Sequence, residues 1–156
     1  MSQQYSFLDM SKTGIWGMSY GGYATGMAMA RDVTNIYKCG ASVSPVTDWR
    51  FANTIATEKF LDLPYPSDQL ASYDQASILN KLSNFVNKKY VVFHGTADDT
   101  VHYQNSMMLV KGLELLEIPF AQISLPDELH SIKPALSYYV FDYIEKFLIE
   151  DCFEIL

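Results

Sequence analysis

The sequence predicts an α/β fold, with a parallel sheet of about four strands and helices on both faces. Two observations support this fold class. Short apolar segments alternate with segments of helical period along a chain of 156 residues. These short segments are apolar throughout, without the polar–apolar alternation of a half-exposed strand, as is typical of parallel strands covered on both faces. The length fits a single domain, and a hydrophobic content of 49% is enough for a core.

The first expected strand is "TGIW" at 13–16, which is short and apolar. The small residues after it favour a closely packed helix at 19–32. "CGASVSP" at 39–45 is the second expected strand, and Pro45 ends it because proline cannot donate to a sheet.

A long connection follows, with helical segments at 50–61 and 74–85 separated by a proline-containing turn at 63–68. The clearest strand is "KYVVFHG" at 89–95, where β-branched and aromatic residues stand between lysines and a glycine.

The last elements are an amphipathic helix at 102–118, a fourth strand at 120–126 and a closing helix at 134–151. Pro134 is well placed to begin that helix, since proline favours the first helical turn. The predicted order is therefore strand and helix, four times over.

In a parallel sheet of this kind, functional side chains gather in the loops at the carboxyl ends of the strands. The loop after the first strand reads "GMSYGG", with Ser19 between glycines where a helix begins. This is the setting of a nucleophilic serine on a sharp turn. Gly17 and Gly21 would avoid Cβ clashes there, and the Tyr20 backbone N–H could donate to an oxyanion. An anion-binding or purely structural glycine turn is the alternative interpretation.

A serine hydroxyl needs a base to activate it and an acid to orient that base. The loop after the third strand contains Asp98 in "GTADDTVH", and the loop after the fourth contains His130 in "PDELHS". Ser19, Asp98 and His130 thus occur in the chain order of α/β-hydrolases. Because each follows a strand of one parallel sheet, we expect them to meet as a catalytic triad.

Other polar residues in these loops have simpler interpretations. His94 lies inside a strand and is expected to be a hydrogen-bonded core residue, while His102 is expected to begin the next helix. Asp99 is the alternative to Asp98 as the orienting acid, or a cap of the following helix. The three histidines and two cysteines show no metal-ligand spacing, so we predict no metal site and no other cofactor.

Charge and cysteine content limit the partners and the compartment. A net charge of −7 argues against nucleic acid or an anionic membrane, because either partner requires a basic face. Cys39 and Cys152 are compatible with two buried thiols or with one disulfide, and their spacing does not decide between these states.

Five segments of the sequence, taken together, form a recognisable pattern: "IWGMSYGGYATGMAMA", "KCGASVSPVTDW", "TEKFLDLP", "VVFHGTADDTVHYQNS" and "DELHSI". In order and spacing they resemble the C-terminal catalytic domain of the prolyl oligopeptidase family, in the branch of dipeptidyl peptidase IV and fibroblast activation protein. The resemblance implies Ser19 as nucleophile, Asp98 as orienting acid, His130 as general base and Tyr20 as an oxyanion donor. It also implies a disulfide between Cys39 and Cys152.

The resemblance further implies a substrate pocket. Val46, Trp49 and Val101 match positions that line the pocket for the residue whose carbonyl is attacked. Ala52 and Ala56 stand where the branch has two pocket tyrosines, which implies a larger pocket without a stacking surface for proline. In the same way, Thr100 replaces an asparagine that holds the substrate backbone.

We therefore expect residues 1–156 to form a partial α/β-hydrolase domain, the C-terminal half of that fold, without the family's upstream strands and β-propeller. The strand at 13–16 would then have an exposed apolar edge. The expected function is the catalytic region of a serine-type exopeptidase that releases N-terminal dipeptides by acyl transfer, with little activity as an isolated chain. The alternatives are a non-catalytic relative that acts through protein association, and an esterase or lipase.

The resemblance also implies partners and location. The substrate would be a peptide, and the full-length parent would be a homodimer with its catalytic domain extracellular, membrane-anchored or secreted. The N-terminal segment "MSQQYSFLDM" is too polar for a signal peptide, so we expect no targeting signal in this chain.

Overall fold

The computed structural model describes residues 5–63 and 70–155, which form a four-stranded parallel sheet. The strands lie side by side in the order β1-β2-β3-β4, and every neighbouring pair is parallel. Their bounds are β1 (Gly14–Met18), β2 (Cys39–Val43), β3 (Lys89–Gly95) and β4 (Ala121–Leu125). The predicted α/β fold with one parallel sheet is confirmed.

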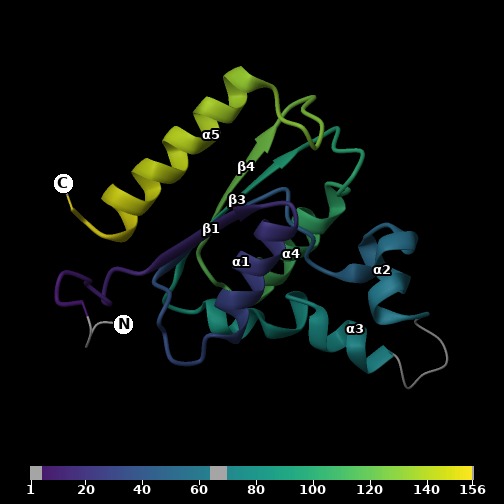
Figure 1. Cartoon of the computed structure of the whole chain (residues 1–156), viewed down its shortest axis with the longest axis horizontal. Coiled ribbons are helices and arrows are strands. Elements are labelled where there is room, and N and C mark those ends of the chain that lie inside the picture. The colour runs from purple at the N-terminus through teal and green to yellow at the C-terminus, as the bar shows by residue number, and fades with distance from the viewer. Residues whose placement is uncertain (1–4, 64–69, 156) are drawn as a thin grey trace.

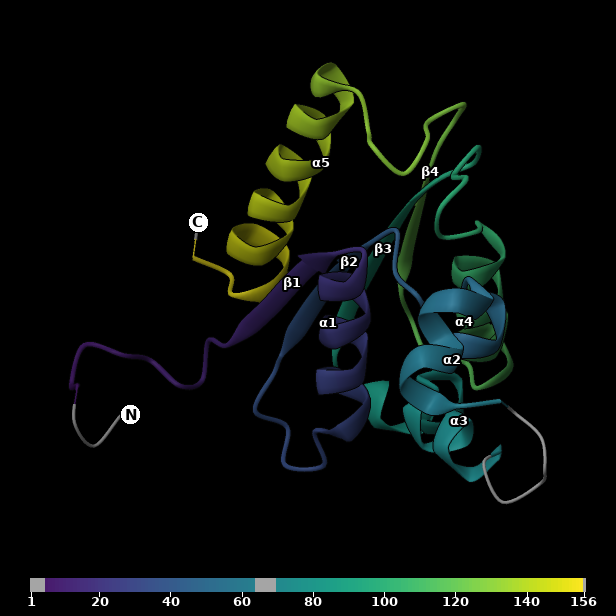
Figure 2. The same ribbon diagram turned by 45° about the vertical axis from the view of Figure 1, so that its right-hand side comes forward.

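Helices cover both faces of this sheet (Figure 1). Helix α5 and the helical turn that follows it lie on one face, and α1 and α4 pack on the other, as the turned view makes clear (Figure 2). The helices are α1 (Tyr20–Arg31), η1 (Trp49–Phe51), α2 (Thr54–Leu61), α3 (Leu70–Ala76), η2 (Leu79–Phe85), α4 (Gln104–Leu115), α5 (Pro134–Lys146) and the π-helical turn η3 (Phe147–Cys152). Along the described part of the chain, no helix is long and apolar enough to cross a membrane.

Two apolar clusters, one on each face, hold the layers together. Below α1, η2 and α4, Met29, Phe85 and Leu109 are fully buried with Val92 of β3. Under α5, Val140 and Ile144 pack against Val91 and Phe93 of β3. Successive residues of β3 thus contribute to opposite clusters, which is why its sequence is apolar without interruption.

Two predicted elements end earlier than expected. The strand predicted at 39–45 ends at Val43, because Ser44 has a positive φ of 45°. The closing helix has regular geometry only to Lys146 and ends in the wider turn of η3.

Two helical segments are predicted between β2 and β3, and the described residues of this connection form four short helices. η1 and α2 replace the first predicted helix, and α3 and η2 replace the second. The break between α3 and η2 falls where the N–H of Ile78 donates to the carbonyl of Thr47, 2.9 Å away, instead of continuing a helix. Most of the proline-containing turn predicted at 63–68 lies outside the described residues.

Strand β1 lies at the edge of the sheet, with β2 as its one partner among the described strands. Trp16 and Met18 of this strand are 47% and 38% exposed, although both are large and apolar. The ring of Trp16 meets Phe141 of α5 in an edge-to-face contact with centroids 5.7 Å apart. The predicted exposed apolar edge is therefore present.

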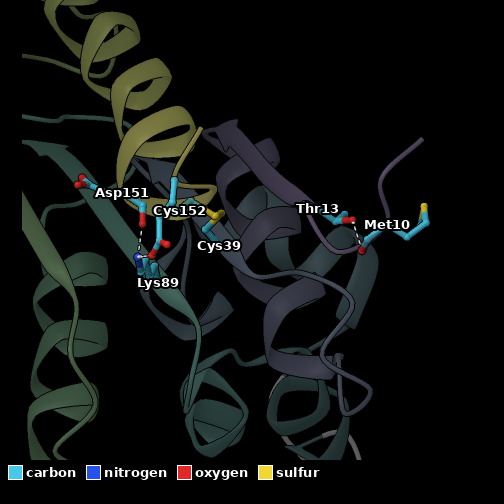
Figure 3. Close-up of a disulfide and its surroundings, with 7 residues drawn as sticks. Met10, Thr13, Cys39, Lys89, Asp151 and Cys152 are labelled. Atoms are coloured by element: carbon cyan, nitrogen blue, oxygen red, sulfur yellow. Dashed lines mark hydrogen bonds and ion pairs between the residues drawn. A yellow bond between two sulfur atoms is a disulfide. The ribbon is translucent and has the colours of Figure 1, made fainter. Parts of the chain in front are cut away.

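The amino ends of the strands are held by a disulfide, a hydrogen bond and an ion pair. Cys39, the first residue of β2, is bonded to Cys152 of η3, as the resemblance implied (Figure 3). Beside it, the ammonium group of Lys89 at the start of β3 donates to the carbonyl of Asp151. A second contact joins Asp32, after α1, to Lys88, with the carboxylate and ammonium 3.3 Å apart and both side chains buried.

Candidate active site

Ser19 lies between β1 and α1 in a strained turn. Its φ is 57° and its ψ is −120°, a conformation that non-glycine residues rarely adopt. The N–H of Ser19 donates to the carbonyl of Val43, 2.8 Å away, and this bond ties the turn to the end of β2. A Cβ on Gly17 would lie 2.4 Å from the carbonyl oxygen of Gly21, so the turn requires glycine at position 17. The same requirement expected for Gly21 is wrong, because a Cβ there would meet open space.

Asp98 is fixed in the loop after β3 by backbone donors. Its Oδ1 accepts hydrogen bonds from the N–H groups of Thr100 at 3.0 Å and Val101 at 2.8 Å. The loop itself is joined to the loop after β4, because the N–H of Ala97 donates to the carbonyl of Glu128. A Cβ on Gly95 would lie 2.3 Å from that carbonyl oxygen, so glycine at the end of β3 permits this close approach.

His130 lies between Ser19 and Asp98. Its Nδ1 is 2.8 Å from Oδ2 of Asp98, and its Nε2 is 2.9 Å from Oγ of Ser19. A carboxylate only accepts hydrogen bonds, so Nδ1 carries the proton and Nε2 is left to accept from the serine hydroxyl. Three residues separated by up to 111 positions in the sequence therefore form one chain of hydrogen bonds at the carboxyl edge of the sheet.

The carboxyl group of Asp98 stays ionised in spite of its burial. Burial by itself raises its pKa, but the hydrogen bonds from His130 and from the Thr100 and Val101 N–H groups outweigh it. The pKa of Asp98 is therefore lower than the ordinary value of an aspartate.

A second histidine reaches the same carboxylate, which sequence reasoning did not anticipate. His94 is fully buried in β3, and its Nε2 lies 2.8 Å from the carbonyl of Val101 and 3.3 Å from Oδ2 of Asp98. Its Nδ1 lies 2.7 Å from the hydroxyl of Ser106 on α4. The expectation of a hydrogen-bonded core histidine is met, and this residue also contacts the carboxylate of Asp98.

The other polar residues of these loops lie outside this hydrogen-bonded chain. Asp99 is exposed and accepts from the hydroxyl of Thr100 at 3.3 Å. His102 precedes α4, which begins at Gln104. The carboxylate of Glu128 is buried, and it accepts from the backbone N–H of Lys133 at 2.7 Å.

The predicted pocket residues are only partly brought together. Tyr20 and Trp49 face each other with ring centroids 6.1 Å apart, and Ala52 lines a shallow recess beside Trp49. Val46 is buried, and Thr100 and Val101 are placed by their N–H contacts to Asp98. Ala56 belongs to α2, and its side chain lies outside the described part of the structure.

The sequence profile of the prolyl oligopeptidase family matches residues 1–153. The chain belongs to this family. Among its relatives, venom dipeptidyl peptidase 4 of Apis mellifera is 42% identical over 132 residues, which cover 85% of this chain and 17% of the relative. Dipeptidyl peptidase 4 of Bos taurus is 35% identical over 151 residues, covering 96% of this chain and 20% of the relative.

Solved structures of the family have the same fold. The crystal structure of dipeptidyl peptidase 4 from Porphyromonas gingivalis superimposes with a TM-score of 0.87 at 35% identity. That match covers 94% of this chain and 20% of the bacterial protein. The chain thus spans about a fifth of the length of the relatives that it matches.

Proposed function

We propose that this chain is the catalytic region of a serine peptidase of the dipeptidyl peptidase type. The observation that carries the proposal is the position of His130, within hydrogen-bond distance of both Ser19 and Asp98. This arrangement supports acyl transfer, with Ser19 as nucleophile, His130 as general base and Asp98 as the group that orients the imidazole. Family membership and the names of the relatives support a peptide as substrate.

In the proposed reaction, Oγ of Ser19 attacks the carbonyl carbon that follows the second residue of a peptide. The serine proton passes to Nε2 of His130, and the imidazolium then gives it to the leaving amine. Water attacks the acyl-serine in the same way and releases the dipeptide. The negative charge of Asp98 stabilises the imidazolium in both half-reactions.

One donor to the oxyanion is available from the turn itself. The N–H of Tyr20 is the first of α1, and the first N–H groups of a helix have no partner within the helix. It lies one residue from the nucleophile, so we assign it to the oxyanion that forms on the attacked carbonyl. Loss of one such donor slows acyl transfer by about 10² to 10³.

The rest of the proposal concerns a longer parent protein. Because the relatives are about five times longer than the part that matches, we propose that residues 1–156 are a partial α/β-hydrolase domain of such a parent. Upstream strands and a β-propeller would complete it, and the parent would be a homodimer with its catalytic domain outside the cell, membrane-anchored or secreted. The Cys39–Cys152 disulfide supports an oxidising compartment.

Covalent labelling tests the nucleophile directly. An alkyl fluorophosphonate should form an adduct at Ser19, located by mass spectrometry of peptides, and Ser19→Ala should abolish it. Ser11→Ala is the matched control, since Ser11 is exposed and its hydroxyl donates to Asp9 far from the sheet's carboxyl edge. Equal labelling of the Ser19→Ala protein would overturn the assignment.

Turnover separates the peptidase from a relative that acts only through protein association. The parent protein should hydrolyse a dipeptide amide with a free amino terminus and leave the same peptide untouched when that terminus is acetylated. A parent that is labelled at Ser19 but cleaves neither form would contradict the dipeptidyl peptidase assignment and keep the serine hydrolase.

A further inference from the structure

A buried histidine lies next to the acid of the proposed triad. His94 is the last residue but one of β3, and its side chain is fully buried. It points to α4, where Oγ of Ser106 lies 2.7 Å from Nδ1. An apolar side chain at this position would need no polar partner, whereas a buried imidazole needs one for each ring nitrogen. Both nitrogens of His94 have such partners, and these partners determine what the ring can do.

The partners of His94 fix which ring nitrogen carries the proton. Nε2 faces two groups that only accept hydrogen bonds: the carbonyl of Val101 at 2.8 Å and Oδ2 of Asp98 at 3.3 Å. Nε2 therefore carries the hydrogen. Burial lowers the pKa of His94, so the ring is neutral near pH 7. Nδ1 is then left to accept from the hydroxyl of Ser106, which is also fully buried.

His94 acts on Asp98 by two routes. In the first, Nε2–H donates to the carbonyl of Val101, whose own N–H donates to Oδ1 of Asp98 at 2.8 Å. The bond to Val101 thus holds the loop in the shape that presents this N–H to the carboxylate. In the second, Nε2 lies 3.3 Å from Oδ2, the oxygen that accepts from Nδ1 of His130. Both routes favour the orientation of the carboxylate that His130 requires.

The ring of Tyr103 packs against the same imidazole. The two rings meet edge-on, with centroids 5.5 Å apart, and the Tyr103 hydroxyl is 2.7 Å from Oγ of Ser124. In the described part of the structure, the titratable side chains that face His94 are therefore Asp98, His130 and Tyr103. The negative charge nearest to Nε2–H is that of Asp98.

We propose that His94 is a positioning residue for acyl transfer, which holds the carboxylate of Asp98 toward His130 while Ser106 keeps the ring proton on Nε2. This inference rests on the proposed function and adds to it a residue outside the triad. Because His94 is fully buried, it does not touch a substrate. Any effect on the rate must pass through Asp98 or through the fold as a whole, and experiments distinguish these two routes.

The first test compares two substitutions of His94 in the full-length parent. His94→Leu removes both polar atoms and should slow fluorophosphonate labelling of Ser19 by about 10- to 100-fold, since a misplacement of about 1 Å costs up to about 10². His94→Gln keeps an N–H donor near the position of Nε2 and should recover most of that rate. With a dipeptide amide, kcat should fall in His94→Leu while KM stays within about twofold, because no contact with the substrate is lost.

A double substitution asks whether the effect passes through Asp98. In the Asp98→Asn protein, His94→Leu should slow labelling by less than about twofold, because the carboxylate that His94 positions is absent. Equal losses with and without the carboxylate would assign His94 to the fold alone and overturn the inference.

Two further variants control for packing. Val92→Ala opens space at a fully buried residue of the same strand, in the apolar cluster below α1 and α4. It should lower the melting temperature and leave the labelling rate unchanged. Ser106→Ala removes the donor to Nδ1 and should slow labelling less than His94→Leu does. If His94→Leu fails to fold, Ser106→Ala decides: a slower rate supports the inference, and an unchanged rate overturns it.

The outcomes separate this inference from the proposed function. Unchanged labelling in both His94→Leu and Ser106→Ala would overturn the inference while Ser19 remains the nucleophile. A loss that His94→Gln does not recover, or that Val92→Ala shares, would overturn it too. If the fluorophosphonate fails to label Ser19 in the unmodified protein, the proposed function fails and this inference fails with it.

Discussion

The two ends of the sheet are stabilised in different ways. At the carboxyl ends of the strands, Ser19, His130 and Asp98 are joined by short hydrogen bonds between loops, and Ser19 has a strained backbone. At the amino ends, a disulfide and the buried Asp32–Lys88 pair join segments that contain none of the triad residues. We therefore expect the reactivity of Ser19 and the stability of the fold to depend on opposite ends of the same strands, and this separation can be tested from both ends.

The largest expected effect lies at the carboxyl end. Asp98→Asn should reduce the rate of fluorophosphonate labelling at Ser19 by about 10³ to 10⁴, because an amide donor opposite Nδ1 favours the wrong imidazole tautomer. The melting temperature should change little, because the substitution acts mainly on the labelling rate. Asp99→Asn changes the neighbouring, exposed carboxylate and should label like the unmodified protein. A similar loss in both variants would show that local charge, and not the His130 contact, sets the rate.

The second largest expected effect is on stability and comes from the amino ends of the strands. Replacing Cys39 and Cys152 together by alanine opens a loop of 113 residues, and the loop-entropy estimate for such a loop is about 4 to 5 kcal/mol of unfolding free energy. The melting temperature should fall by about 10 °C or more. Scanning calorimetry measures the fall, while labelling of Ser19 at 25 °C should stay within about twofold. A large loss of labelling in a protein that is still folded would contradict the separation of the two ends.

The smallest expected effect on stability concerns His94, a buried residue of β3 whose Nε2 lies 3.3 Å from Oδ2 of Asp98. Burial lowers the pKa of His94, while the Val101 carbonyl and the charge of Asp98 partly oppose that shift and the nearby His130 adds to it. The unfolded chain therefore takes up a proton before the folded protein does as the pH falls. Stability should decrease below about pH 6.5, by up to about 1.4 kcal/mol per pH unit from this one group.

Urea unfolding at pH 7, 6 and 5 measures that dependence. His94→Gln should remove part of the slope, and His102→Gln, which changes an exposed histidine before α4, should keep it. If both variants retain the slope of the unmodified protein, His94 is not the group that titrates.

Much of this molecule could be predicted from the sequence because the relevant signals are local. A parallel sheet places the carboxyl ends of all its strands at one edge. Three loops that follow strands and contain a serine, an aspartate and a histidine were therefore enough to predict that Ser19, Asp98 and His130 meet. The strands themselves are short apolar runs with clear ends, as in "KYVVFHG".

The remaining features depend on contacts between distant segments. An apolar recess is lined by Tyr23 from α1, Trp49 from η1 and Ala76 from α3. No local sequence pattern shows that these three segments converge. The contact of His94 with Asp98 has the same character, since a histidine inside a strand gives no sign of which side chain it faces. The break between α3 and η2 also arises from a tertiary contact, the bond of Ile78 to Thr47.

The disulfide has a practical consequence for following this protein in solution. The loop that it closes contains Asp98 and His130, while Ser19 precedes Cys39 and stays outside. A single proteolytic cut within the loop would leave both fragments covalently attached, so the clipped protein would migrate as one band until a reductant is added. A cut between Ser19 and Cys39 would instead separate the labelled serine from the fragment that contains Asp98 and His130. Paired gels with and without reductant therefore report where limited digestion occurs.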